Sequence, residues 1–260
     1  MKVQHRSTKD QYRSTTIEKA LSVLELFKEH VKLSFTDIQQ ELGMNKTTLF
    51  RILYTLEANE YLSRDENGRY LLGLNIFILG NSFSRGKHIG RVFAPYLRQL
   101  ATELNLTSHL GMVEGTNIVI TGKEDPPDSI KMFSRIGRLV PAHCTGQGKT
   151  ILAYLPADRM RMIVSRHGLT RYTANTITNM DELLEELEKI RNRGYAFDNS
   201  EHEKHIRCVS VPVLGSDGEI EAALSVTGVA MEFDDREKVE RIAHLLRDTV
   251  SKGRRELGFS

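Results

Sequence analysis

The sequence predicts an α+β protein with a small N-terminal module and a larger mixed domain. Two observations support this prediction. Residues 35–73 have the pattern of two short amphipathic helices and a hairpin, and from about residue 89 helical stretches alternate with strand-like runs. Adjacent strand pairs next to helices are typical of an antiparallel sheet that is flanked by helices.

The chain is organised around the helix pair at 35–59. Asn45 is a suitable N-cap, so we expect the second helix to begin at Lys46. Gly43 is suited to end the first helix. Helix, glycine-containing turn and helix in this order are typical of a helix-turn-helix. The apolar face of the second helix consists of Leu49, Ile52, Leu53 and Leu56.

The second helix of a helix-turn-helix enters the DNA major groove and places its N-terminal residues against base edges and phosphates. Its side chains outside the apolar face are therefore candidate DNA-binding residues. They are Asn45, Lys46, Thr47, Thr48, Arg51 and Tyr54. An ordinary helical hairpin in a globular core is the alternative interpretation of this pattern.

A hairpin follows the helix pair directly. Asn67-Gly68 is typical of a two-residue turn with positive φ angles, and it lies between the strand-like runs 61–64 and 69–72. Such a hairpin is a wing, and Arg64 and Arg69 near its tip are expected to contact phosphates that flank the site.

A third helix is expected before the pair. Three helices and a wing make a winged helix-turn-helix, which we assign to residues 15–73. The core face of this first helix is predicted to consist of Ile17, Ala20, Leu21, Leu24 and Phe27.

Two segments flank this module. Residues 1–14 form a flexible basic arm that either contacts phosphates or a minor groove or serves only as a solubilising tail. Residues 74–88 read as a linker helix whose apolar residues cover much of its circumference. That surface suggests pairing with a second copy. Docking on the chain's own second domain, assigned to residues 89–260, is the alternative.

The composition is that of an ordinary globular protein, with 40% apolar and 27% charged residues. The formal net charge of the 260 residues is only +2. DNA binding is therefore supported by where charges lie and not by their sum. The N-terminus has no apolar signal-peptide core, and the longest apolar-rich run, 71–79, is too short to span a bilayer. We expect a cytoplasmic protein.

The second domain is predicted to contain two hairpins and five helices. A helix at 91–103 contains Pro95, which either kinks it or lies near its true start. The remaining elements are a hairpin at 107–113 and 118–123, a short strand at 130–133, helices at 150–155 and 156–166, a helix at 181–193 capped near Thr178, a second hairpin at 207–214 and 219–227, and a final helix at 234–256.

Small and polar residues gather at the ends of these elements, where ligand pockets are built. The stretch 143–149 runs into a helix, and its N–H groups and helix dipole are suited to hold a carboxylate. A plain glycine-rich helix start is the alternative. Ser225 and Thr227 place two hydroxyls on one face at the end of a strand. An ordinary strand terminus without a binding role is the alternative.

A metal site or an enzyme is the rival function. His202, His205 and Cys208 are spaced by three, but no fourth metal ligand is evident. Cys144 lies beside His143 in sequence only, which does not establish the geometry that a nucleophile requires. We therefore expect no catalytic residue, no cofactor and no bound metal.

Seven segments keep a common order and spacing over some two hundred residues. They are IEKALSVLELF, LSFTDIQQELGMNKTTLFRILYTLE, GRYLLG, SRIGRLVPAHCTGQGKTILAYLP, RNRGYAFDNSE, IRCVSVPV and AALSVTG. In these segments the chain resembles the IclR family of bacterial transcriptional regulators. The resemblance implies a winged helix joined by a linker helix to a GAF-like effector domain, in dimers that commonly pair into tetramers.

The resemblance also implies a ligand-responsive regulator, more often a repressor than an activator, of a catabolic operon. Its partners would be double-stranded DNA with a palindromic operator and a small-molecule effector, often a short carboxylate. The family's pocket falls on Thr145, Gly146, Gln147, Asp198, Cys208, Ser225, Val226 and Thr227. One departure is His205, where the family usually has glycine. Either the loop is reshaped or an imidazole enters the pocket.

Overall fold

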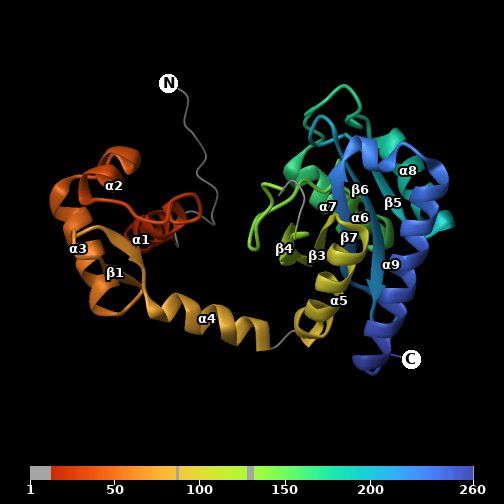
Figure 1. The fold of residues 1–260 in the computed structure, drawn as a ribbon. Coiled ribbons are helices and arrows are strands. Elements are labelled where there is room, and N and C mark those ends of the chain that lie inside the picture. Colours follow the sequence, from red (N-terminus) through yellow and green to blue (C-terminus); the bar gives the residue numbers. More distant parts are fainter. Residues whose placement is uncertain (1–12, 86–87, 128–131, 260) are drawn as a thin grey trace, which may run out of the picture. The chain divides into compact units, whose positions relative to one another are not determined.

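The computed structural model describes residues 13–85, 88–127 and 132–259, so the expectation for the basic arm falls almost entirely outside the described residues. The chain divides into two compact units, Met1–Lys87 and His88–Ser260 (Figure 1). Across the described ranges, no helix is both long enough and apolar enough to cross a membrane.

The N-terminal unit is a winged helix-turn-helix followed by one further helix, as predicted. Its core joins all three helices of the bundle and the wing, and includes Val23, Ile38, Leu49 and Tyr70. The elements are α1 (Thr15–Leu26), α2 (Phe35–Leu42), α3 (Lys46–Ala58), β1 (Leu62–Arg64), β2 (Tyr70–Leu72) and α4 (Leu74–Arg85).

Side-chain caps determine where the helix pair begins and ends. The hydroxyl of Ser34 accepts a hydrogen bond from the Asp37 N–H, and the Asp37 carboxylate accepts one from the Ser34 N–H at 2.8 Å. Gly43 ends α2 with a left-handed φ of 61°. Asn45 Oδ1 accepts from the Thr48 N–H at 2.8 Å, so α3 begins at Lys46 as predicted.

The buried face of α1 differs from the predicted one. Val23 is fully buried and Phe27 is 8% exposed, whereas Ile17 and Leu21 are 60% and 55% exposed. Val23 and Phe27 lie one helical turn apart and pack into the core with α2 and α3. Ala20, Leu24 and Phe27 of the predicted face therefore pack in the core, Val23 was missed, and Ile17 and Leu21 are exposed instead of buried.

The wing turn is one residue longer than predicted. The Gly68 N–H donates to the Asp65 carbonyl and the Asp65 N–H donates to the Arg69 carbonyl, both at 2.9 Å. Only Gly68 of the Asn67-Gly68 pair has a positive φ, of 73°. The Asp65 carboxylate also accepts from the N–H groups of Asn67 and Arg69 at 3.0 Å. These bonds select a three-residue loop with a left-handed glycine over the two-residue turn.

The C-terminal unit is a five-stranded antiparallel sheet with helices on both faces. The strand order is β4-β3-β7-β6-β5. The elements are α5 (His88–Leu104), β3 (Thr107–Glu114), β4 (Asn117–Glu124), α6 (Gly146–Tyr154), α7 (Ala157–His167), α8 (Met180–Arg193), β5 (Ala196–Asn199), β6 (Ile206–Leu214), β7 (Ile220–Val229), the short 3₁₀ helix η2 (Ala230–Phe233) and α9 (Arg236–Glu256).

Each sheet face has its own core. The helices α5 and α9 cover one face, where Phe93 and Leu246 pack against Leu224 and Val226 (Figure 1). The helices α6, α7 and α8 belong to the core on the other face. The two hairpins and the flanking helices agree with the predicted α+β class.

Several predicted elements needed correction. The helix α6 begins at Gly146, not Thr150, and Asn179, not Thr178, caps α8. Pro95 lies inside α5, which begins at His88. The edge strand β5 was not predicted. In the predicted strand at 130–133, residues 132 and 133 are not in a strand, and 130 and 131 lie outside the described residues.

Candidate ligand pocket and nucleic-acid interface

The first turns of α3 present a polar surface. Lys46, Thr47, Arg51 and Tyr54 are exposed there, on the side opposite the buried apolar residues of the same helix. The side-chain oxygen Oδ1 of Asn45 caps the helix, and its side-chain NH₂ group is left for other contacts. This surface has the position from which a recognition helix contacts base edges and phosphates.

The two arginines of the wing differ in their surroundings. Arg64 is bonded to Glu57 of α3 at 2.9–3.0 Å, and its guanidinium lies 4.6 Å from the centre of the Tyr70 ring. Arg69 is exposed beside the wing loop. Phosphate contact by Arg64 would thus compete with Glu57, whereas Arg69 is presented to solvent.

Phe50 belongs to the exposed surface of α3, although it was not among the predicted DNA-binding residues. Its side chain is 57% exposed and its ring stacks on that of Tyr54, which is 64% exposed, at a centroid distance of 6.4 Å. Helical spacing was the available signal, because residue 50 lies beside Thr47, Arg51 and Tyr54 on a helical projection.

A solvent-open pocket lies in the C-terminal unit between the sheet and the N-terminal end of α6, and its empty space, including the open solvent at its mouth, is about 650 Å³. It is lined by seven of the eight residues predicted for the effector pocket. They are Thr145, Gly146, Gln147, Asp198, Cys208, Ser225 and Thr227.

Val226 is the exception. It is fully buried in the core formed with α5 and α9, on the opposite face of the sheet from its neighbours Ser225 and Thr227. Successive side chains of a strand point to opposite faces, so residues 225 to 227 of one strand cannot all line one pocket. The assignment of Val226 to the pocket was therefore wrong.

The strand register brings the polar side chains of this wall together. His109 of β3 is paired with Ser225 of β7, Thr227 of β7 with Cys208 of β6, and Cys208 with Asp198 of β5. Four strands thus contribute one polar row across the sheet, from residues as far apart in the chain as His109 and Thr227. The Oγ of Ser225 forms no hydrogen bond of good geometry among the described residues, although its hydroxyl acts to lower the pKa of the neighbouring Cys208 thiol.

The N-terminus of α6 lies directly against this row. Thr145 caps the helix by accepting from the Gly148 N–H at 3.0 Å, and it donates to the Pro141 carbonyl at 2.7 Å. A Cβ atom on Gly146 would lie 2.7 Å from the Cys208 sulfur. Glycine is required for this approach, which brings the positive end of the helix dipole to the cavity.

Burial determines the charge states in the cavity. Burial raises the pKa of Asp198 to about 7, against the lowering effect of the hydrogen bond from the Glu201 N–H. Burial lowers the pKa of His109 to about 4, so its imidazole is neutral, and its Nε2 lies 2.6 Å from the Ser134 hydroxyl. Arg138 is the one lysine or arginine among the lining residues that the structure describes.

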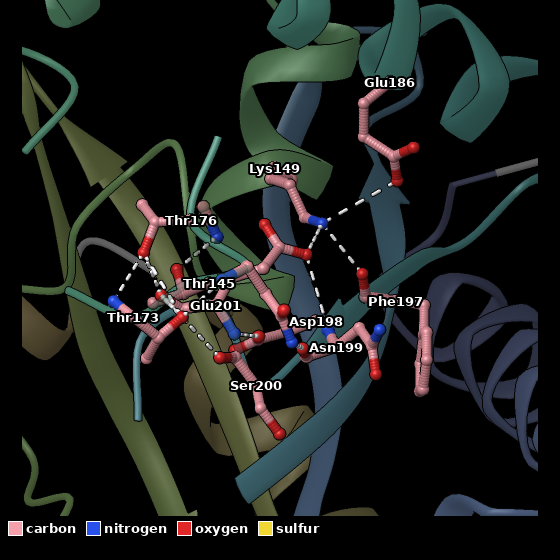
Figure 2. Close-up of polar contacts among 12 residues, drawn as sticks. Thr145, Lys149, Thr173, Thr176, Glu186, Phe197, Asp198, Asn199, Ser200 and Glu201 are labelled. Atoms are coloured by element: carbon pink, nitrogen blue, oxygen red, sulfur yellow. Dashed lines mark hydrogen bonds and ion pairs between the residues drawn. The ribbon is translucent and has the colours of Figure 1, made fainter. Parts of the chain in front are cut away.

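A buried ion pair supports the wall that carries Asp198 (Figure 2). Lys149 of α6 is 1% exposed, and its ammonium group is bonded to the Glu201 carboxylate and to the Phe197 carbonyl, the latter at 2.8 Å. Thr176 donates to the Glu201 carbonyl at 2.6 Å. Lys149 is predictable from the sequence as a residue near a helix start, but no local pattern indicates its partner, which is 52 residues away.

The rival metal and nucleophile sites are not assembled. His205 is exposed and does not line the cavity. Its φ of 63° is left-handed, a backbone conformation that suits the glycine usual in the family, and its own imidazole does not line the cavity. No cluster of three or more potential metal ligands occurs in the part of the chain that the structure describes.

The chemistry of the cysteines also differs from that of a nucleophile. Burial raises the pKa of Cys208 to about 12, and burial also raises the pKa of Cys144. The His143 Nε2 lies 2.9 Å from the Thr170 carbonyl.

Comparison with known proteins agrees with the two-part organisation. Residues 16–66 match the IclR helix-turn-helix domain, and residues 83–253 match the bacterial transcriptional regulator IclR C-terminal family. The HTH-type transcriptional regulator XynR of Escherichia coli (strain K12) is 33% identical over 229 residues, which cover 85% of this chain and 89% of XynR.

Solved structures share the fold. The crystal structure of the Thermotoga maritima IclR has 32% identity and a TM-score of 0.79, and the match covers 94% of this chain and 99% of that one. An IclR homolog of Microbacterium hydrocarbonoxydans, solved with 4-hydroxybenzoate, has 19% identity and a TM-score of 0.84 over 95% of this chain and all of that one, which shows the fold alone. The chain therefore belongs to the IclR family of bacterial DNA-binding transcriptional regulators.

Proposed function

We propose that this regulator represses a catabolic operon and that a small organic acid changes its affinity for the operator. The cavity at the α6 N-terminus is the observation that most directly supports binding of an effector. The HTH-type transcriptional repressor AllR of Klebsiella pneumoniae, 27% identical over 245 residues, supports the assignment as a repressor. The effect of the effector on operator affinity is the coupling free energy between the two sites.

A carboxylate suits the chemistry of the cavity. Helix geometry leaves the N–H groups of Gly146 and Gln147 without partners inside α6, at the positive end of its dipole. Arg138 lies at the lining, and the Ser225 hydroxyl has a free hydrogen-bonding capacity among the described residues. With a pKa near 7, Asp198 is partly protonated at neutral pH and then donates a hydrogen bond instead of repelling an anion.

A homo-oligomer, dimer or tetramer, is part of the proposal. Leu74, Phe77 and Leu79 of α4 are 61%, 70% and 53% exposed, an apolar surface suited to a second copy. A two-fold dimer presents two copies of α3, which matches a palindromic operator. A protein that regulates a bacterial operon acts in the cytoplasm, where the DNA lies.

Selection of genomic fragments by the purified protein, followed by sequencing, tests this function. At about 0.15 M salt much of the sequence-independent binding is suppressed. We expect a few enriched sites that share an inverted repeat next to catabolic genes, and a change in enrichment when the corresponding organic acids are added. Absence of any enriched sequence, with and without cell metabolites, would contradict the proposal.

Replacing Arg51 by alanine is expected to weaken operator binding about 10- to 100-fold, the usual effect of losing one side chain that contacts a base. Effector affinity should not change. Both are measured by titration of the purified variant, with operator DNA and with the acid. Arg166→Ala on α7 removes the same charge from the C-terminal unit and should leave operator affinity unchanged. If Arg51→Ala keeps full operator affinity, Arg51 does not contribute to DNA binding.

Replacing Ser225 by alanine is expected to weaken effector binding about 5- to 10-fold, the effect of one lost hydrogen bond. The free energy of unfolding should stay within about 0.5 kcal/mol of the wild type, because the Oγ forms no hydrogen bond of good geometry among the described residues. Calorimetric titration with the acid and denaturant unfolding measure the two effects. Unchanged effector affinity would exclude Ser225 from the pocket.

A further inference from the structure

The recognition surface of α3 contains an apolar element that its polar residues do not explain. Phe50 and Tyr54 are one helical turn apart, and their exposed rings are stacked with an interplanar angle of 22°. Single exposed apolar residues are common on proteins. A stacked pair in the middle of a DNA-facing surface is a more specific arrangement.

The charges around this pair favour a polyanion as its partner. Lys46 lies one turn before Phe50, and Arg51 is its neighbour; both side chains are exposed. Glu57 is the one acidic residue of α3, and it is bonded to Arg64 of the wing. The surface around the two rings is thus positive and matches the phosphates of DNA better than a second copy of the same positive surface.

The position of Phe50 limits which part of the DNA it contacts. The helix begins at Lys46, so Phe50 lies at the start of its second turn, among the residues that meet base edges in the major groove. A phenyl ring has no hydrogen-bond donor or acceptor for a base edge. The apolar group that unmodified DNA presents in the major groove is the C5-methyl group of thymine.

We propose that Phe50 recognises a thymine methyl group in each half of the operator, with Tyr54 holding its ring in place. The stack reduces the number of rotamers that the Phe50 ring has to lose on binding. Cytosine at the same position lacks the methyl group, so Phe50 selects for thymine. The proposal assigns a base to Phe50 and rests on α3 being the recognition helix.

Substitution of single thymines by deoxyuridine tests this assignment, because it removes only the methyl group and keeps the base pair. The full-length protein is titrated with a selected operator in which each thymine is replaced in turn, at about 0.15 M salt. We expect one thymine in each half-site at which the substitution weakens binding about fourfold, the effect of one methyl group lost from apolar contact.

Phe50→Ala should bind the thymine operator less tightly and lose its sensitivity to deoxyuridine at that position, while other thymines keep their effects. Thermal unfolding of this variant should match the wild type, because the ring is exposed. Val31→Ala is the matched control: Val31 is 82% exposed in the same unit but lies outside α3, and its loss should change neither quantity.

Two results would overturn the assignment. In one, no thymine is sensitive to loss of its methyl group. In the other, Phe50→Ala keeps the wild-type sensitivity to deoxyuridine, or it changes only the oligomeric state. A change in oligomeric state alone would show that the Phe50 ring contacts a second copy of the protein and not DNA. A wild-type protein that selects no DNA sequence at all would instead overturn the proposed function, so the two failures are distinguishable.

Discussion

Replacing Lys149 by methionine is expected to lower the free energy of unfolding by about 3–5 kcal/mol. Lys149 is 1% exposed and Glu201 is 5% exposed, so the pair is almost entirely removed from water. The ammonium group pairs with Glu201 Oε1, which otherwise accepts only a long hydrogen bond, of 3.4 Å, from the Asn199 N–H, and Oε2 has no partner among the described residues. Without the ammonium group, the Glu201 carboxylate would be left as a buried charge next to Asp198, or would have to be protonated.

A double variant separates the loss of the pair from the loss of Lys149 packing. Lys149→Met combined with Glu201→Gln removes both charges and should recover most of the lost stability, since no unpaired buried charge remains. Denaturant unfolding of the two variants measures this recovery. Lys189→Met, on the exposed face of α8, is the control and should be within about 0.5 kcal/mol of the wild type. Equal losses in the single and double variants would show that packing and not charge is responsible.

The parts of the fold that depend on local chemistry were predictable. The cap at Asn45 and the left-handed glycine at Gly43 act within a few residues of themselves, and the helix pair begins and ends where they predict. The hairpin of β6 and β7 follows from alternation and a turn, and its strands were predicted to within two residues at each end.

The face of α1 was not predictable in the same way. Ala20, Leu24 and Phe27 fit two overlapping apolar stripes, one completed by Ile17 and Leu21 and the other by Val23. Only packing against α2 and α3 selects between these stripes, and it selects the second. The edge strand β5 has only four residues and is defined by its pairing with β6. No local sequence pattern predicts that pairing.

The candidate site shows the same division. The Gly-rich start of α6 and the hydroxyls of Ser225 and Thr227 were selected from the sequence, and all of them line the cavity. The Lys149–Glu201 pair joins residues 52 positions apart, so no spacing pattern indicates it. Val226 was a different kind of error, because strand alternation alone was sufficient to exclude it.

Asp198 is expected to make the protein less stable as the pH rises from about 4 to about 7. Burial raises its pKa from 3.8 in the unfolded chain to about 7 in the folded one. Between these values the folded state binds more protons than the unfolded state, so the contribution is complete below pH 4 and is lost as the pH rises through 7. A shift of about three pKa units corresponds to about 4 kcal/mol.

The variant Asp198→Asn isolates this contribution. Its amide oxygen can still accept the hydrogen bond from the Glu201 N–H, while the titrating proton is gone. We expect the variant to equal the wild type near pH 4 and to be more stable by up to about 4 kcal/mol at pH 8. Denaturant unfolding across this range measures the difference between the two proteins.

That difference is the decisive quantity, because other groups titrate in the same window. The pKa of His109 is lowered to about 4 by burial, so its own contribution to stability increases as the pH rises from 4 to 6.5, opposite in sign to that of Asp198. Subtraction of the two pH profiles removes His109, which is present in both proteins. A constant difference between pH 4 and pH 8 would show that Asp198 is ionised throughout, and a pocket with that fixed negative charge would no longer favour a carboxylate effector.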